Sequence, residues 1–183
     1  MIFYSLSEIY SEKQSVLSRL QKSVTGLSPE QLVSHPQEGR WSISEVLEHV
    51  LLVDASLLKL INALLGKVEN AGTHGEPANA FPMDLRALVD QSNKEKYIAR
   101  ENAQPTGKVS ASDSLRESER IQGELLSLQP RLESIDLSSI SFPHFALGPL
   151  TLGQWFAFIG IHEERHLRQI EGLIASKEFL QTR

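Results

Sequence analysis

Hydrophobic residues recur every three or four positions over four long stretches of the chain, which is the spacing of helices with one buried face. The first stretch predicts a helix over about residues 5–25, with Lys13 on its solvent-facing surface. Its apolar stripe consists of Leu6, Ile9, Val16, Leu17, Leu20 and Val24. A second helix is expected over about residues 42–66, because Ser42 and Glu45 have the spacing of a capping box at its start.

The third and fourth stretches lie in the C-terminal half of the chain. The third predicts a helix over about residues 112–135, which Pro130 should kink or end early. The fourth predicts a helix from Thr151, which forms another capping box with Gln154, to Ile174. The segment between them, SFPHFALGPL, is expected to be a loop because of its prolines and glycine.

Four amphipathic helices without an alternating strand pattern predict an all-α four-helix bundle, in one domain over residues 1–183. The connection over residues 66–110 is rich in Gly, Pro and Asn, with a short helix expected over about 84–92. A connection of this length allows a crossover between the second and third long helices. Because long irregular segments in compact domains are often functional, we expect this one to form a flap over a site.

Three titratable side chains lie on the apolar face of the fourth helix. His162, Glu163 and His166 share the arc that Trp155 and Ile170 define. A buried polar side chain costs free energy unless it has a partner, and two imidazoles one helical turn apart are natural ligands for one metal ion. Glu163 is therefore expected to act as a general base or to hydrogen-bond a ligand imidazole, with a plain salt bridge as the alternative.

The run His162-Glu163-Glu164-Arg165-His166 matches the H-E-x-x-H motif of zinc peptidases, but the third ligand of such an enzyme is missing. Gln169 and Gly172 occupy the places where that pattern needs a glycine and a third histidine. A di-iron carboxylate site needs a second Glu-x-x-His motif, which the chain does not have at the right spacing. These departures disfavour both readings and leave a mononuclear site.

His49 is the candidate for a third ligand, because it is the histidine that falls in another predicted helix, whereas His35, His74 and His144 fall in predicted loops. Three histidine ligands leave coordination positions open for water or substrate, as in catalytic sites. Zinc, nickel, iron and manganese all remain possible, because imidazole ligands alone do not select among them. Asp54, on the same helix as His49, is expected to be structural.

Composition and charge narrow the function further. The sequence contains no cysteine, which excludes disulfides and a cysteine nucleophile and favours a reducing cytoplasm. The net charge of −5 comes without a basic stripe, which argues against nucleic-acid binding. Neither a signal peptide nor a run of about 18 apolar residues stands out. We therefore expect a cytoplasmic protein that acts on a small molecule without a membrane, and that forms a homodimer through an exposed helix face.

The residues WSISEVLEH, ending at His49, together with LGPLTLGQWFAFIGIHEERHLRQI, resemble the DinB/YfiT-like family of bacterial four-helix metalloproteins. The resemblance covers most of the chain and implies that His49, His162 and His166 are the metal ligands. It also implies activation of a low-molecular-weight thiol, such as bacillithiol or mycothiol, for transfer or isomerisation. A thiol-dependent S-transferase is the preferred expectation. A non-catalytic binding or dimerisation module and a metal-dependent hydrolase are the alternatives.

Overall fold

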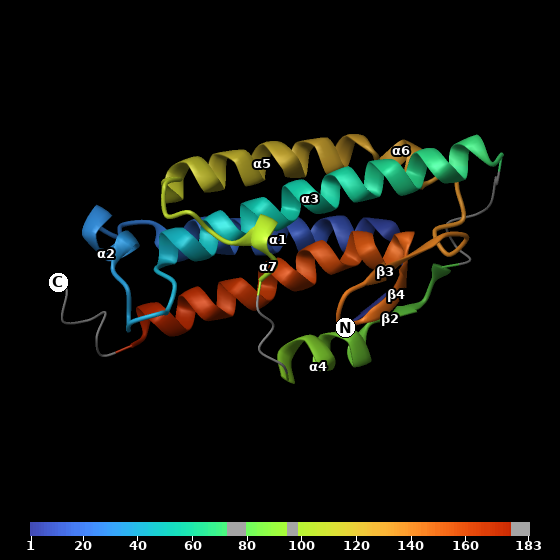
Figure 1. The fold of residues 1–183 in the computed structure, drawn as a ribbon. Coiled ribbons are helices and arrows are strands. Elements are labelled where there is room, and N and C mark those ends of the chain that lie inside the picture. Colours follow the sequence, from blue (N-terminus) through green and yellow to red (C-terminus); the bar gives the residue numbers. More distant parts are fainter. Residues whose placement is uncertain (73–79, 95–98, 177–183) are drawn as a thin grey trace.

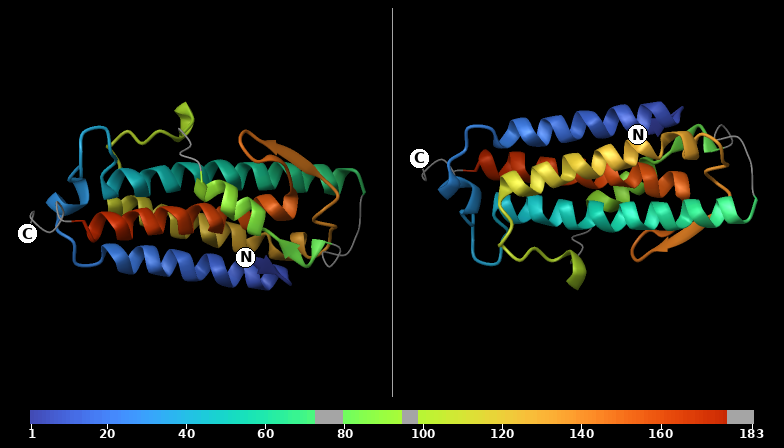
Figure 2. Two further views of the ribbon diagram at one scale, coloured as in Figure 1. Left: turned by 90° about the horizontal axis from the view of Figure 1, so that it is seen from below. Right: turned by 90° about the horizontal axis from the view of Figure 1, so that it is seen from above.

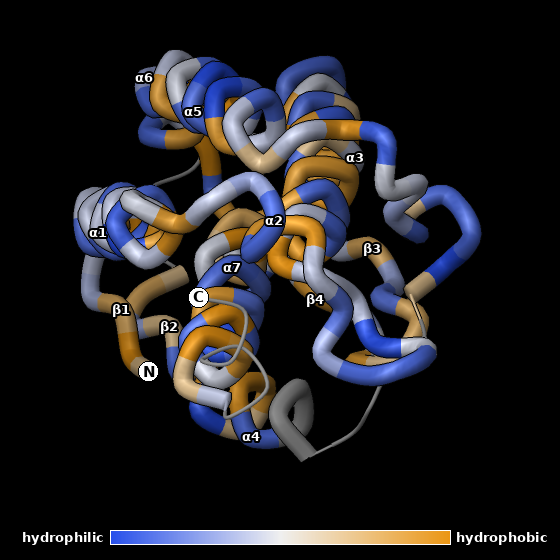
Figure 3. Tube along the Cα trace, turned by 90° about the vertical axis from the view of Figure 1, so that its left-hand side faces the viewer, coloured by the Kyte–Doolittle hydropathy of each residue, from blue (hydrophilic) through white to orange (hydrophobic). Residues whose placement is uncertain are grey.

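The computed structural model describes residues 1–72, 80–94 and 99–176 and confirms the predicted four-helix bundle. Four long helices lie side by side (Figure 1), namely α1 (Leu6–Val24), α3 (Ile43–Asn70), α5 (Ala111–Ser127) and α7 (Leu152–Ile174). α1 packs against α5 and α7, and α3 packs against the same two helices. Hydrophobic residues lie mainly on the sides of the helices that face one another (Figure 3), so they form the core.

The bundle does not follow simple up-down order. α1 and α7 run in one direction, and α3 and α5 run in the other (Figures 1 and 2). The neighbours α3 and α5 are therefore parallel, so the connection between them has to return along the bundle, as the length of the predicted connection allows. This connection contains α4 (Arg86–Lys94), close to the short helix expected there, and the 3-10 helix η2 (Glu101–Ala103). The parts of the expected flap at 73–79 and 95–98 lie outside the described residues.

The predicted capping boxes form at the starts of the helices. The Ser42 hydroxyl accepts from the Glu45 amide, and the Glu45 carboxylate accepts from the Ser42 amide. Thr151 and Gln154 make the same reciprocal pair at the start of α7. A third box opens the short α2 (Pro29–Val33). Each box satisfies amides that the first helical turn leaves without a partner.

Two predicted helix ends differ from the observed ones. α3 continues past Gly66 to Asn70, because Val68 extends the buried stripe one turn beyond Leu64. The helix expected over 112–135 ends at Ser127, and a separate turn, α6 (Gln129–Leu132), follows it. Pro130 explains the break, because it has no amide hydrogen to donate. By length and composition alone α3 could cross a membrane, but Glu48, His49 and Asp54 are buried among its neighbours as in a core helix.

The prediction of a loop over residues 141–150 is wrong, because this segment forms a β-hairpin. β3 (Ser141–His144) pairs antiparallel with β4 (Gly148–Thr151), with Pro143 opposite Pro149. Gly148 has a φ of 77°, which residues with a side chain rarely adopt. A second small sheet pairs β1 (Ile2–Phe3) with β2 (Met83–Asp84). Both sheets have two strands and lie at one end of the bundle, so the fold class is unchanged.

The assignment of Lys13 to the surface is also wrong, because this lysine is buried between α1 and α7. Its Nζ donates to Oε1 of Glu163 at 2.9 Å, and both side chains are almost inaccessible to solvent. Gly160 makes room for the lysine stem, since a Cβ there would lie 3.1 Å from Lys13 Cγ. Lys13 follows Ile9 by four residues and precedes Val16 by three, so the sequence places it inside the apolar stripe of α1.

Asp54 of α3 completes this buried cluster, which agrees with the structural role expected for it. Burial, followed by the negative charge of Glu163, raises the pKa of Asp54 well above its usual range. The environment of Asp54 therefore favours the protonated form of its carboxyl group. In that form its carboxyl group can donate to Glu163, whose Oε2 has no other partner among the described residues. We call Lys13, Glu163 and Asp54 the buried charge cluster.

We expect Lys13→Met to lower the free energy of unfolding by about 3–5 kcal/mol, because it leaves the Glu163 charge buried without its cation. The double variant Lys13→Met/Glu163→Gln removes both charges and should recover part of this loss. Chemical denaturation of the three proteins at neutral pH measures both effects. A Lys13→Met protein within about 1 kcal/mol of wild type would contradict the pairing.

Candidate metal centre

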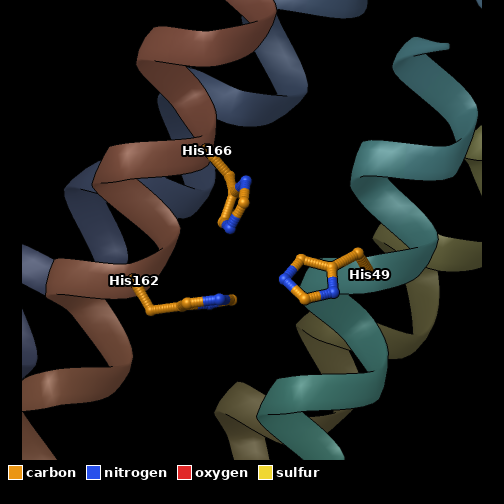
Figure 4. Close-up of side chains that lie close together, drawn as sticks. All are labelled: His49, His162 and His166. Atoms are coloured by element: carbon orange, nitrogen blue, oxygen red, sulfur yellow. The ribbon is translucent and has the colours of Figure 1, made fainter. Parts of the chain in front are cut away.

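Three histidines from two helices point toward one another across the interface between α3 and α7 (Figure 4). His49 lies in the second turn of α3, and His162 and His166 lie one turn apart on α7. The ring centroid of His49 lies 5.2 Å from that of His162 and 4.8 Å from that of His166. The two α7 rings are 4.5 Å apart. The structure thus brings together the three residues that the sequence predicts as ligands.

Hydrogen bonds fix the tautomers of His49 and His166. Nδ1 of His49 lies 2.7 Å from the carbonyl oxygen of Ala103, and Nδ1 of His166 lies 2.9 Å from Oε1 of Gln169. An oxygen of this kind only accepts, so Nδ1 carries the proton in both rings and Nε2 keeps its lone pair. Outer hydrogen bonds of this kind are what orients the histidine ligands of metal sites.

The Ala103 carbonyl is held in place by a neighbouring residue that the sequence analysis did not single out. Glu48, buried next to His49, accepts hydrogen bonds from the amide and hydroxyl of Thr106 and from the amide of Gly107. Burial opposes ionisation of Glu48, but these hydrogen bonds outweigh it and lower its pKa. The end of the long connection is therefore tied to α3 beside the first ligand.

All three imidazoles are neutral at physiological pH. Burial is the main cause, and it lowers the pKa of His49, lowers that of His162 well below the usual range, and brings that of His166 to about 3. The positive charge of Arg165 lowers each pKa further. Only a neutral imidazole has a lone pair to bind a metal, so the three rings are in the required state.

The donor set fits one transition-metal ion. One ligand nitrogen from each histidine lies within 4.8 Å of the other two. Two nitrogens bound to one zinc at about 2.1 Å lie at most about 4.2 Å apart, so small ring rotations would close the site. Nδ1 of His162 is buried and has no hydrogen-bond partner among the described residues. A neutral imidazole keeps a lone pair on one ring nitrogen, and a cation bound there would give the buried ring a polar partner.

The histidines line one part of a cavity of about 290 Å³. Ala99, Arg100 and Ala103 from the long connection also line it, so this part of the expected flap does lie at the site. His144, from the hairpin, and Arg165, from α7, line it as well. A cavity next to the ligands leaves room for a substrate at open coordination positions.

Glu163 does not lie with the histidines, although the sequence places it on the same helical face. Its carboxylate points toward α1 and accepts from Lys13, and among the described residues that line the cavity there is no Glu163. The hydrogen bond expected between Glu163 and a ligand imidazole is not made. Ala103 and Gln169 provide those bonds instead, and a backbone carbonyl leaves no signal in the sequence.

A four-helix bundle with three neutral histidines beside an open cavity defines a helical protein with a candidate metal centre. Comparison with known proteins places it more closely. A family model described as the DinB superfamily matches residues 14–170. The chain therefore belongs to the DinB superfamily.

Relatives and solved structures agree with this assignment. The uncharacterized protein YuaE of Bacillus subtilis (strain 168) is 31% identical over 147 residues, which cover 80% of this chain and 85% of YuaE. The four-helix bundle protein TT2238 superimposes with a TM-score of 0.58 and 17% identity, covering 92% of this chain and 99% of TT2238. YfiT from Bacillus subtilis superimposes with a TM-score of 0.53 and 15% identity, covering 92% and 85%. The two structures confirm the fold.

The lowered pKa of His166 predicts how the metal-free protein responds to acid. The imidazole titrates near 6.5 in an unfolded chain but at about 3 in the folded protein, because it is buried. Between these values the unfolded state binds the extra proton, so stability falls as the pH drops. We expect the stability of metal-free wild type relative to His166→Gln to fall by about 2 kcal/mol between pH 7 and pH 5.

Urea unfolding of both proteins at the two pH values measures this change, and the comparison cancels the titration of other groups. Chelator should be present throughout, since a bound metal would stabilise the wild type alone. A stability difference that is the same at both pH values would mean that folding does not perturb His166.

Proposed function

We propose that this protein is an enzyme that holds one divalent transition metal through His49, His162 and His166 and uses it to activate a low-molecular-weight thiol for transfer to an electrophile. The observation that carries the proposal is the convergence of three neutral, oriented imidazoles on one side of an open cavity. The four candidate metals remain zinc, nickel, iron and manganese, because the ligand set suits each of them.

The metal would supply the chemistry that the chain itself lacks, since a coordinated thiol is deprotonated outright and a coordinated water reaches a pKa of about 7. The chain contains no cysteine, so a thiol nucleophile must come from outside. The protein's own residues orient the ligands, through Ala103 and Gln169. Arg165 adds positive charge beside them, which favours an anionic reactant.

Hydrolysis is the second candidate, because the structurally similar YfiT is described as a probable metal-dependent hydrolase. A hydrolase of this kind is helped by a general base that takes a proton from the attacking water. The described residues that line the cavity include no carboxylate, and Glu163 is paired with Lys13. A thiol is more acidic than water before it binds, so it would lose its proton to solvent on coordination without such a base, and this difference favours thiol transfer.

The proposal also covers location and assembly. An enzyme that uses a free thiol needs a reducing compartment, and the absence of cysteine agrees with the cytoplasm. The substrate is a small molecule, since the cavity between α3, α7, the hairpin and the long connection has the size of a ligand site rather than a nucleic-acid groove. The homodimer and the absence of membrane binding stay predictions. A non-catalytic binding module is the alternative if, in the experiment below, neither thiol changes the spectrum and no metal-dependent ester hydrolysis occurs.

The cobalt-substituted protein separates the candidates. We expect bacillithiol or mycothiol to produce a new near-ultraviolet absorption band typical of sulfur coordination in wild type, and no band in His162→Ala. His35→Ala, which removes an exposed histidine paired with Glu45, should behave as wild type and is the control. If neither thiol changes the spectrum while ester hydrolysis depends on the metal and on His162, the hydrolase reading replaces the thiol reading.

A further inference from the structure

The cavity beside the three histidines carries positive charge and no described negative charge. Two arginines and four histidines line it, and the described residues that line it include neither aspartate nor glutamate. The chain as a whole has the opposite balance, with 23 acidic and 18 basic residues. A cavity whose described lining has two arginines and no acidic side chain, in an acidic protein, is suited to an anion.

The remaining lining of the cavity is mostly apolar. Leu57 and Leu60 come from α3, Trp155 and Phe158 come from α7, and Leu147 comes from the hairpin. A volume of about 290 Å³ is much larger than a single water needs, which is about 30 Å³ in the liquid. The ligand that this space fits therefore has an apolar body as well as a charge.

His144 is the polar residue that the hairpin contributes to the cavity, and its tautomer is fixed by the turn. Nδ1 accepts from the backbone amides of Ala146 and Leu147, each at 3.2 Å. An amide can only donate, so Nδ1 keeps its lone pair and the proton lies on Nε2, on the side of the ring away from the turn. Burial, followed by the charge of Arg100, lowers the pKa of His144 to about 4, which agrees with a neutral ring.

Aromatic contacts hold this imidazole in place. The ring stacks on Phe145 with centroids 4.6 Å apart, and it contacts Phe158 at 5.0 Å and Trp155 at 5.3 Å. The guanidinium of Arg100 lies over the same Phe145 ring, 4.6 Å from its centroid. A donor that cannot ionise easily and a permanent cation therefore lie on one aromatic ring at the wall of the cavity.

We propose that the hairpin side of the cavity is a recognition subsite for an amphipathic anion, an apolar chain or ring that ends in a carboxylate, with the Nε2–H of His144 and the guanidinium of Arg100 as its polar contacts. The subsite rests on the proposed function, because it names the class of molecule bound beside the metal ligands. Leu57, Leu60 and Phe158 contact the apolar body. An amine of the same shape is rejected, because no described acidic residue in the cavity would pair with it.

Calorimetric titration of the full-length protein tests this subsite with three eight-carbon probes: octanoate, octylammonium and octanol. The titrations are made with the protein as purified and again after chelation, so that binding through a metal is separated from binding at the hairpin. We expect octanoate to bind at least tenfold more tightly than octylammonium in both states. Equal affinity for the two ions, or no binding of octanoate, would overturn the subsite.

Two variants identify the polar contacts. His144→Asn keeps an oxygen acceptor for the Ala146 and Leu147 amides but lacks the Nε2–H. We expect it to keep the thermal midpoint of wild type and to lose about tenfold in octanoate affinity, with octanol unchanged. Arg100→Gln should also weaken octanoate alone and should reduce the salt dependence of its binding. If His144→Asn does not fold, the Arg100→Gln variant alone still tests the subsite.

If Arg100→Gln and a folded His144→Asn both bind octanoate as tightly as wild type, the assignment of both polar contacts is overturned. Failure of this proposal differs visibly from failure of the proposed function. If only the proposed function fails, the protein binds no metal but still binds octanoate in the presence of chelator. Protein with an intact metal centre and no subsite would bind a thiol but would not distinguish octanoate from octylammonium.

Discussion

The burial of α7 on two sides is the constraint on which the candidate site depends. Toward α1, Glu163 is buried against Lys13, and an unpaired carboxylate there would cost several kcal/mol. Neighbouring residues on a helix project about 100° apart, so fixing Glu163 against α1 directs His162 and His166 toward α3. The buried charge cluster therefore sets the rotation of the helix that carries two of the three candidate ligands. Gly160 allows this approach, because the stem of Lys13 occupies the space of a side chain.

The parallel arrangement of α3 and α5 brings the end of the long connection to the site. Two parallel neighbours need a connection that returns along the bundle, and the end of this connection lies against α3 near His49. Glu48 holds it there through Thr106 and Gly107, and its Ala103 carbonyl orients the first ligand. The topology and the site are thus linked, since a short hairpin between these helices would leave His49 without its partner.

Periodicity made the four helices and two of the histidines predictable, because helix spacing alone puts His162 and His166 one turn apart on a buried face. His49 was predicted because it falls in another helix and because of the family resemblance. Periodicity did not show which neighbour each side of α7 meets, and so it left Glu163 between a role beside the ligands and a salt bridge. Lys13 was misplaced for a related reason: its charge outweighed its position within the apolar stripe. The β-hairpin was not predicted, because Pro143, Gly148 and Pro149 are residues typical of loops. Ala103 acts through its backbone, which no side-chain pattern records.

Metal content by elemental mass spectrometry shows whether His49, His162 and His166 together bind a metal ion. The protein should be free of an affinity tag, because a tag carries its own histidines, and should be reloaded with each candidate metal after chelation. We expect close to one metal per chain in wild type and in the surface control His35→Ala, and loss of that metal in His49→Ala and in His162→Ala. Metal retained in His49→Ala would contradict the three-histidine assignment, and a wild type that binds none would contradict the centre itself.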